Sequence, residues 1–166
     1  MNNNLGFLDN SLIQNSTLSC ILLTYFIKEY ENVASKTESP DLLKILLVLP
    51  LLWNKETCLT ISKKKKKTSL FKVVSENPLI NLNLDKRVSE FAAISIQGLN
   101  IASSCGLIFR RIDENDIILC SNFDNWPRGY SLANVPPDMI SATKRLAFWF
   151  KNYSTERLYS LLMGGN

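Results

Sequence analysis

The sequence contains no histidine among its 166 residues. It therefore has no imidazole to act as a general base, as the partner of a Ser or Cys nucleophile, or as a metal ligand. Its six glycines are scattered, so no glycine-rich phosphate-binding loop is present. Two carboxylate pairs, Glu29 with Glu31 and Asp113 with Asp116, stand in no nucleophile or metal context. We therefore expect a non-enzymatic protein with no cofactor and no small-molecule substrate.

Paired cysteine motifs and long hydrophobic runs are also missing. The four cysteines are Cys20, Cys58, Cys105 and Cys120. None has the CxxC spacing of a zinc or redox site, so we expect buried free thiols in a reducing cytoplasm. The longest apolar stretch, Ile45 to Trp53, contains Pro50 and is far shorter than the ~20 residues of a membrane span. With no signal peptide visible, the sequence predicts a soluble, cytoplasmic protein.

Positive charge is scarce outside one segment. The chain has 19 basic and 15 acidic residues, a net charge of +4, and five of the basic residues form the run Lys63 to Lys67. Without that run, the rest of the chain has 14 basic and 15 acidic residues, a net charge of −1. Nucleic-acid modules usually spread Lys and Arg over a whole face. The basic character therefore belongs to a local feature, and the low charged content, 20%, leaves room for an apolar surface that a partner covers.

Apolar residues recur at helical spacing through most of the chain, and residues that favour helix starts and ends stand between these stretches. We expect a loosely ordered N-terminus over residues 1–15 and a short extended piece from Cys58 to Ile61. The expected helices cover residues 16–35, 41–49, 68–76, 85–104, 138–152 and 154–162. In the second of these, Pro50 is expected to kink or end the helix. The third follows the lysine run, and Gly106 is expected to close the fourth as its C-cap.

One segment has a clear β pattern. Residues 107–112 and 117–120 predict two strands, and Asp113 to Asp116 a tight turn between them. The fold class is therefore mostly α with one β-hairpin (α+β), in one domain over residues 1–166. Its parts are a helical region (16–106), the hairpin (107–121) and C-terminal helices (138–163). Helices followed by a hairpin also give the order of a winged-helix-like helical domain.

The lysine run is the first candidate site. The candidate DNA contacts are Lys63, Lys64, Lys65, Lys66, Lys67 and Lys72. Each could neutralise a phosphate and release a counterion. A run of like charge is also commonly a solvated loop tip, and that interpretation stays open.

Arginines and aromatics form the second candidate set. Arg110 and Arg111 lie in the hairpin, but three acids in the turn would repel phosphate, which favours a protein contact over DNA. Trp149 and Tyr153 share one side of the helix over residues 138–152, by their i, i+4 spacing. This side is either core or a partner surface, where aromatics concentrate. The candidate partner-binding positions are therefore Trp53, Arg110, Arg111, Trp149 and Tyr153.

Several segments resemble a known family. Residues 47–57, Leu-Val-Leu-Pro-Leu-Leu-Trp-Asn-Lys-Glu-Thr, resemble the LVLPL-x-x-h-K-x-T-R signature of the middle components of three-component ABC-ATPase systems. Here Trp53-Asn54 replaces the usual Leu-His, and Cys58 the usual Arg. The stretch after residue 60, the helix at residues 70–77, the helix start at residues 85–88 and residues 147–150, Ala-Phe-Trp-Phe, are similar to further family segments. The resemblance covers about residues 15–164.

The resemblance implies a non-enzymatic accessory subunit. Such a subunit would bridge an SMC/Rad50-like ATPase and an effector, often a nuclease, in defence against phage and plasmids, as in Lamassu-type systems. The subunit would bind the ATPase and help to engage DNA or to restrain the effector. It would contact DNA as part of the assembled complex. The alternative is a free-standing winged-helix DNA-binding regulator, whose DNA affinity would fall steeply with salt.

Overall fold

The computed structural model describes residues 15–164, so the expectation for the N-terminal segment falls almost wholly outside the described residues. The helices are α2 (Ser16–Val33), α3 (Leu42–Leu46), α4 (Val48–Leu52), α5 (Lys55–Lys63), α6 (Leu70–Glu76), a 3-10 turn η1 (Pro78–Ile80), α7 (Leu84–Ser104), α8 (Pro137–Lys151) and α9 (Thr155–Met163). The strands are β1 (Ile108–Asp113) and β2 (Asp116–Ser121). The predicted class, mostly helical with one β-hairpin, is confirmed. None of the helices within residues 15–164 combines the length and apolar character needed to cross a membrane.

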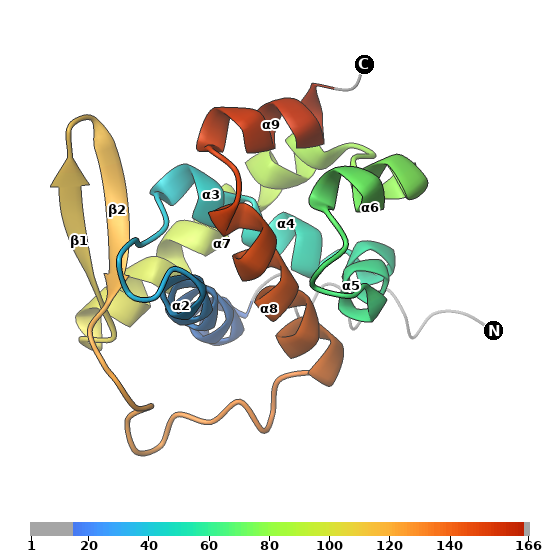
Figure 1. Ribbon diagram of the computed structural model, residues 1–166. Helices are drawn as coiled ribbons and strands as arrows, with labels where there is room; N and C mark the ends of the chain where they lie inside the picture. The colour runs from blue at the N-terminus through green and yellow to red at the C-terminus, as the bar shows by residue number, and fades with distance from the viewer. Residues whose placement is uncertain (1–14, 165–166) are drawn as a thin grey trace.

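Helix α2 runs through the centre of the molecule (Figure 1). The Asn15 side chain caps it by accepting a hydrogen bond from the Leu18 amide at 2.8 Å. Its buried side chains pack against α7 and α8, and the ring of Phe26 meets that of Phe150 edge to face at 5.8 Å. Most of the apolar burial that stabilises the fold therefore gathers around this helix.

The apolar segment after Pro40 forms two short helices and not one. The break falls at Leu47, between α3 and α4, and the chain stays helical past Pro50. Proline is tolerated there because it lies in the first turn of α4, where an amide has no intrahelical partner in any case. Of the two outcomes expected at Pro50, a kink or an end, the end was therefore wrong, because α4 continues to Leu52.

The extended piece expected from Cys58 to Ile61 was also wrong, because these residues lie in α5. The Asn54 side chain caps α5 by accepting from the Thr57 amide at 3.0 Å. Cys58 and Ile61 then face inward at helical spacing, and α5 packs on α8. Its β-branched residues suggested a strand, and tertiary packing overrides that local preference.

Arg87 ties three segments of the N-terminal half together. Its guanidinium donates to the carbonyls of Pro50 and Ile80, each at 2.7 Å, and to that of Leu82 at 3.2 Å. These carbonyls belong to α4, to η1 and to the turn before α7, so one planar guanidinium donates hydrogen bonds to three separate chain segments. It thereby fixes the start of the long helix α7.

The predicted hairpin is present, and its register sets Ile112 opposite Ile117 and Asp113 opposite Asp116, so both acids belong to the strands and not to the turn. Its base is fixed by Glu31 of α2, which is 9% exposed and accepts from the Ser121 amide at 2.9 Å. A single bridge pairs Asp41, between α2 and α3, with Ile118 of β2. The outer edge of β1 carries no further strand in the sheet of the described residues. The winged-helix topology stays a prediction.

The cysteines differ in burial, which gives a direct chemical prediction. Cys20, Cys58 and Cys120 are buried, as predicted, whereas Cys105 at the end of α7 is exposed. Burial raises the pKa of the Cys58 thiol to about 12 and also raises that of Cys20, so neither forms a reactive thiolate near neutral pH. We expect a disulfide reagent to titrate one thiol per native chain at pH 8 and four per chain in guanidinium chloride.

Cys105→Ser should remove the fast native reaction and leave three thiols in denaturant. Fast reaction of two or more thiols in the native wild-type protein would contradict the packing described for these cysteines.

Candidate functional site

The lysine run begins where α5 ends. Lys63 is the last residue of α5, and residues 64–69, here called the lysine loop, connect α5 to α6. The end of α5 is held to α8 because the Ser62 hydroxyl lies 3.2 Å from a carboxylate oxygen of Asp138. The Ser69 side chain then caps α6 by accepting from the Lys72 amide at 3.3 Å. Side-chain hydrogen bonds therefore hold both ends of the loop in place.

Two side chains of α8 hold the backbone of the lysine loop. The Arg145 guanidinium donates to the Lys64 carbonyl, and the Trp149 indole N–H donates to the Thr68 carbonyl at 2.8 Å. A turn bond from the Thr68 amide to the Lys65 carbonyl, 3.0 Å, closes the loop on itself. These contacts occupy backbone carbonyls and leave the lysine side chains free to meet a ligand.

The lysines differ in how their charges are balanced. The Lys64 ammonium lies 3.3 Å from Glu76, and Lys72 lies 3.8 Å from the same carboxylate. Lys65, Lys66 and Lys67 are exposed, and no carboxylate of residues 15–164 lies within ion-pair distance of them. Lys63, at the end of α5, is likewise exposed with no carboxylate of residues 15–164 within ion-pair distance, so the uncompensated charge of the run lies on four lysines, three of them in the lysine loop.

A hollow of about 370 Å³ lies between the lysine loop and the junction of α8 with α9. Its lining is Lys66, Lys67, Thr68, Ser69, Leu70, Phe148, Trp149, Asn152, Tyr153 and Arg157. The Arg157 guanidinium lies 5.9 Å from the centre of the Tyr153 ring, within cation–π range. The lining holds three cations, two half-buried rings and no carboxylate. We call it the basic hollow.

The structure separates the aromatic residues that the sequence grouped as partner-binding. Trp149 is only 2% exposed and lies in the core, while Tyr153, one turn later, is half-buried at the rim of the basic hollow. Trp53 is 9% exposed, and its ring meets Phe91 edge to face at 5.5 Å. Of these three aromatics, Tyr153 has the ring best placed for an external ligand.

The hairpin arginines lie far from the lysine loop. The hairpin projects from one end of the molecule, whereas α5 and α6 lie at the opposite end (Figure 1). Arg110 and Arg111 are exposed among apolar side chains that are also exposed: Phe109, Ile112 and Ile117. Of the second candidate set, the structure therefore brings Trp149 and Tyr153 beside the lysine loop and leaves Arg110 and Arg111 apart from it.

The comparison that identifies the chain is with protein families. The model of the family described as "ABC-three component (ABC-3C) system Middle Component 3" matches residues 9–163. The chain belongs to this family. No curated protein and no solved structure gave a significant match. A middle component is an accessory module of such a system, distinct from its ATPase, and interacts with the other components.

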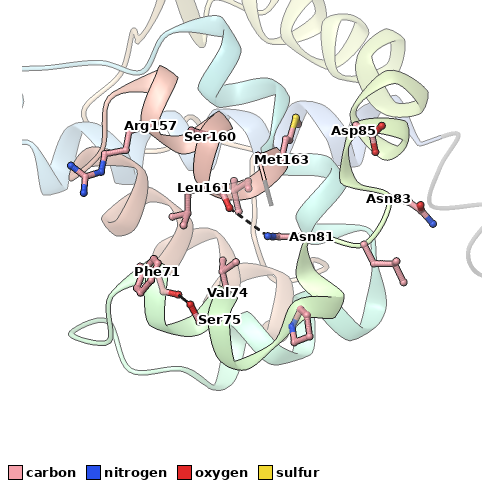
Figure 2. A pocket seen from close by; sticks show the side chains of 14 residues that line it. Phe71, Val74, Ser75, Asn81, Asn83, Asp85, Arg157, Ser160, Leu161 and Met163 are labelled. Atoms are coloured by element: carbon pink, nitrogen blue, oxygen red, sulfur yellow. Dashed lines mark hydrogen bonds between the residues drawn. The ribbon is translucent and has the colours of Figure 1, made fainter. Parts of the chain in front are cut away.

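This middle component also has a larger groove of mixed polar and apolar lining, which the sequence did not indicate. The groove has a volume of about 880 Å³ and lies between α6 and α9, as Figure 2 shows. Phe71, which is 62% exposed, lines it from α6, and Leu161 and Met163 line it from α9. At its base the Asn81 side-chain amide donates to the Leu161 carbonyl at 3.4 Å. An isolated exposed phenylalanine in a helix gives no sequence signal, because the groove depends on α9 packing beside α6.

Arg145, Arg157 and Asn152 complete the surroundings of the lysine loop, and no motif in the sequence indicated a role for them. They lie about 80 residues from the loop along the chain, on α8, in α9 and at the α8 C-cap. The sequence feature nearest to them was the aromatic cluster at residues 148–153. This cluster contains Trp149, whose indole holds the lysine loop.

Proposed function

We propose that this middle component is a bridging subunit of an SMC/Rad50-like ATPase complex acting in defence against phage and plasmids. In this proposal it binds the ATPase and the effector, a nuclease, and its lysine loop contacts DNA held by the complex. The observation that carries the DNA contact is the loop itself. Its backbone is anchored by Arg145 and Trp149, while three lysines carry charge without an acidic partner. Because the loop backbone is already held, less conformational entropy is lost when its lysines bind phosphate than in a free loop.

The protein contacts in this proposal use the hairpin. Exposed Ile112 and Phe109 beside Arg110 and Arg111 form the mixed apolar and arginine surface that protein interfaces favour. The hairpin and the lysine loop lie at opposite ends, which suits a subunit that bridges a protein and DNA (Figure 1). Tyr153 remains a proposed contact, now at the basic hollow.

The DNA contact is tested by a charge-matched pair of triple variants. We expect K65Q/K66Q/K67Q to weaken binding of a 20-base-pair duplex about tenfold at 0.1 M salt and to reduce the salt slope by about 2–3, because each lysine releases a counterion. The control, K36Q/K55Q/K86Q, removes the same charge from exposed positions elsewhere. The measurement is fluorescence anisotropy over a salt series. Equal losses in both triples would show that only net charge matters, and no loss in the loop triple would refute the contact.

The bridging role is tested by co-expression with the genes that flank this one. We expect K65Q/K66Q/K67Q to co-purify with the ATPase and the effector as the wild-type protein does, and to lower DNA-triggered activity. Assembly of the ATPase and effector without this subunit would refute the role. Failed assembly with unchanged DNA binding would make the lysine loop a docking site for an acidic protein surface.

The alternative, a free-standing winged-helix DNA-binding regulator, fits the charges less well. Its recognition helix would be α7, whose exposed face presents Asp85 and Glu90. Its wing would be the hairpin, whose tip presents exposed Asp113, Glu114 and Asp116. The acidic tip repels phosphate, and on α7 the exposed Lys86 is paired with Glu90 at 3.9 Å. A regulator would bind duplex DNA alone, with a loss of affinity in Arg110 and Arg111 variants equal to that in the lysine-loop triple.

A further inference from the structure

We infer that the basic hollow binds one unpaired nucleotide of single-stranded DNA, with its base against Tyr153 and its phosphate at Lys66, Lys67 and Arg157. This inference rests on the proposed DNA contact of the lysine loop and names the form of DNA that the site takes.

The charges of the hollow select an anion. Lys66 and Lys67 approach from the loop, and Arg157 approaches from α9 on the other side. No carboxylate lines the space. Thr68, Ser69 and Asn152 add hydrogen-bonding groups beside these cations. A phosphate bound here would therefore meet three positive charges with no acid to repel it, and such charge-assisted contacts are the strong ones.

The aromatic side chains select a planar group next to that anion. Tyr153 and Phe148 are half-buried, so part of each ring remains accessible from the hollow. The Arg157 guanidinium lies 5.9 Å from the centre of the Tyr153 ring, so a cation for the phosphate is held next to the ring that would stack the base. An acidic peptide would use the cations and leave the rings without a matching partner. A base joined to a phosphate uses both.

The size of the hollow excludes a duplex. A volume of about 370 Å³ is that of a small-ligand site. A double helix keeps its bases stacked inside and presents its phosphates on a convex surface, so it would contact the rim and leave the hollow empty. Single strands expose each base for stacking on an aromatic side chain. The hollow therefore suits an unpaired nucleotide at an end, a gap or an opened duplex.

The test compares a 12-residue thymidine oligonucleotide with a 12-base-pair blunt duplex by fluorescence anisotropy, on the full-length protein. We expect Tyr153→Leu to weaken binding of the single strand about tenfold and leave the duplex unchanged, because stacking on one base is lost. Tyr153→Phe keeps the ring and should bind as the wild-type protein does. Arg157→Gln, an exposed position, should also weaken single-strand binding more than duplex binding. Thermal unfolding of each variant confirms that it is folded.

Each outcome has one meaning. Equal effects of Tyr153→Leu on both DNAs, or none on either, would overturn the nucleotide site while a loss in K65Q/K66Q/K67Q would still support the DNA contact. Absence of any DNA binding by the wild-type protein would overturn both. Competition by polyglutamate as strong as that by unlabelled thymidine oligonucleotide would overturn the nucleotide in favour of an acidic protein segment.

Discussion

Trp149→Ala is expected to lower the free energy of unfolding by about 4 kcal/mol, the usual cost of truncating a buried tryptophan. The ring is 2% exposed and packs in the core, so its removal leaves a cavity that rigid neighbours only partly fill. The substitution also removes the indole N–H that donates to the Thr68 carbonyl at 2.8 Å. We therefore expect a shifted urea midpoint with an unchanged slope.

Trp149→Phe separates the two roles of the side chain. Phenylalanine keeps much of the apolar volume but cannot donate to Thr68, so we expect a loss of about 2 kcal/mol. The lysine loop should then open more often, and trypsin should cleave it faster. The matched control is Trp126→Phe, a half-buried ring in the connection before α8 that packs against Phe123 at 4.8 Å. Equal cleavage rates in Trp149→Phe and the wild-type protein would show that the indole does not hold the loop.

The same tryptophan shows how far the sequence could predict the candidate site. Spacing predicted Trp149 and Tyr153 on one side of one helix and left open whether that side was core or partner surface, but α8 ends at Lys151 and Tyr153 lies in the connection to α9. In the structure Trp149 lies in the core, and Tyr153, after the end of α8, lies half-buried at the rim of the basic hollow. No local pattern contains that information. It depends on contacts such as Trp149 with Thr68, 81 residues apart.

The fold was predicted best where local and tertiary signals agree. Helix α7 begins and ends within one residue of its predicted bounds, since a long amphipathic stripe is followed by Gly106 with a φ of +70°. Helix α5 was missed because its nine residues carry weak helix formers, and its burial against α8 decides the conformation. The lysine run was predicted as an exposed charged segment from composition alone, whereas its anchoring by α8 was not predictable.

The second large effect is expected at Gly98, where α7 crosses α2. A Cβ built on Gly98 would lie 2.8 Å from the Cys20 backbone nitrogen and would also overlap the Ser19 side chain. Both groups belong to α2, the central helix, and the Ser19 hydroxyl is fixed by donating to the Ile94 carbonyl at 3.0 Å. Neither can move without separating the two helices. Glycine is therefore required here for close approach of two backbones.

Gly98→Ala is expected to destabilise the protein by about 3 kcal/mol, the upper end of the usual cost of overpacking. The direction of the change in unfolding free energy tests the close approach, because the same substitution in an exposed helix interior would stabilise the protein by about 1 kcal/mol through helix propensity. The control is Gln97→Ala, an exposed position one residue earlier, which should change stability by less than about 0.5 kcal/mol. Combining Gly98→Ala with Ser19→Gly removes one of the two overlapping residues and should recover part of the loss, a coupling measurable in a double-mutant cycle. A stabilised Gly98→Ala would mean that α2 and α7 lie farther apart than described, and the central packing on which the lysine loop depends would need revision.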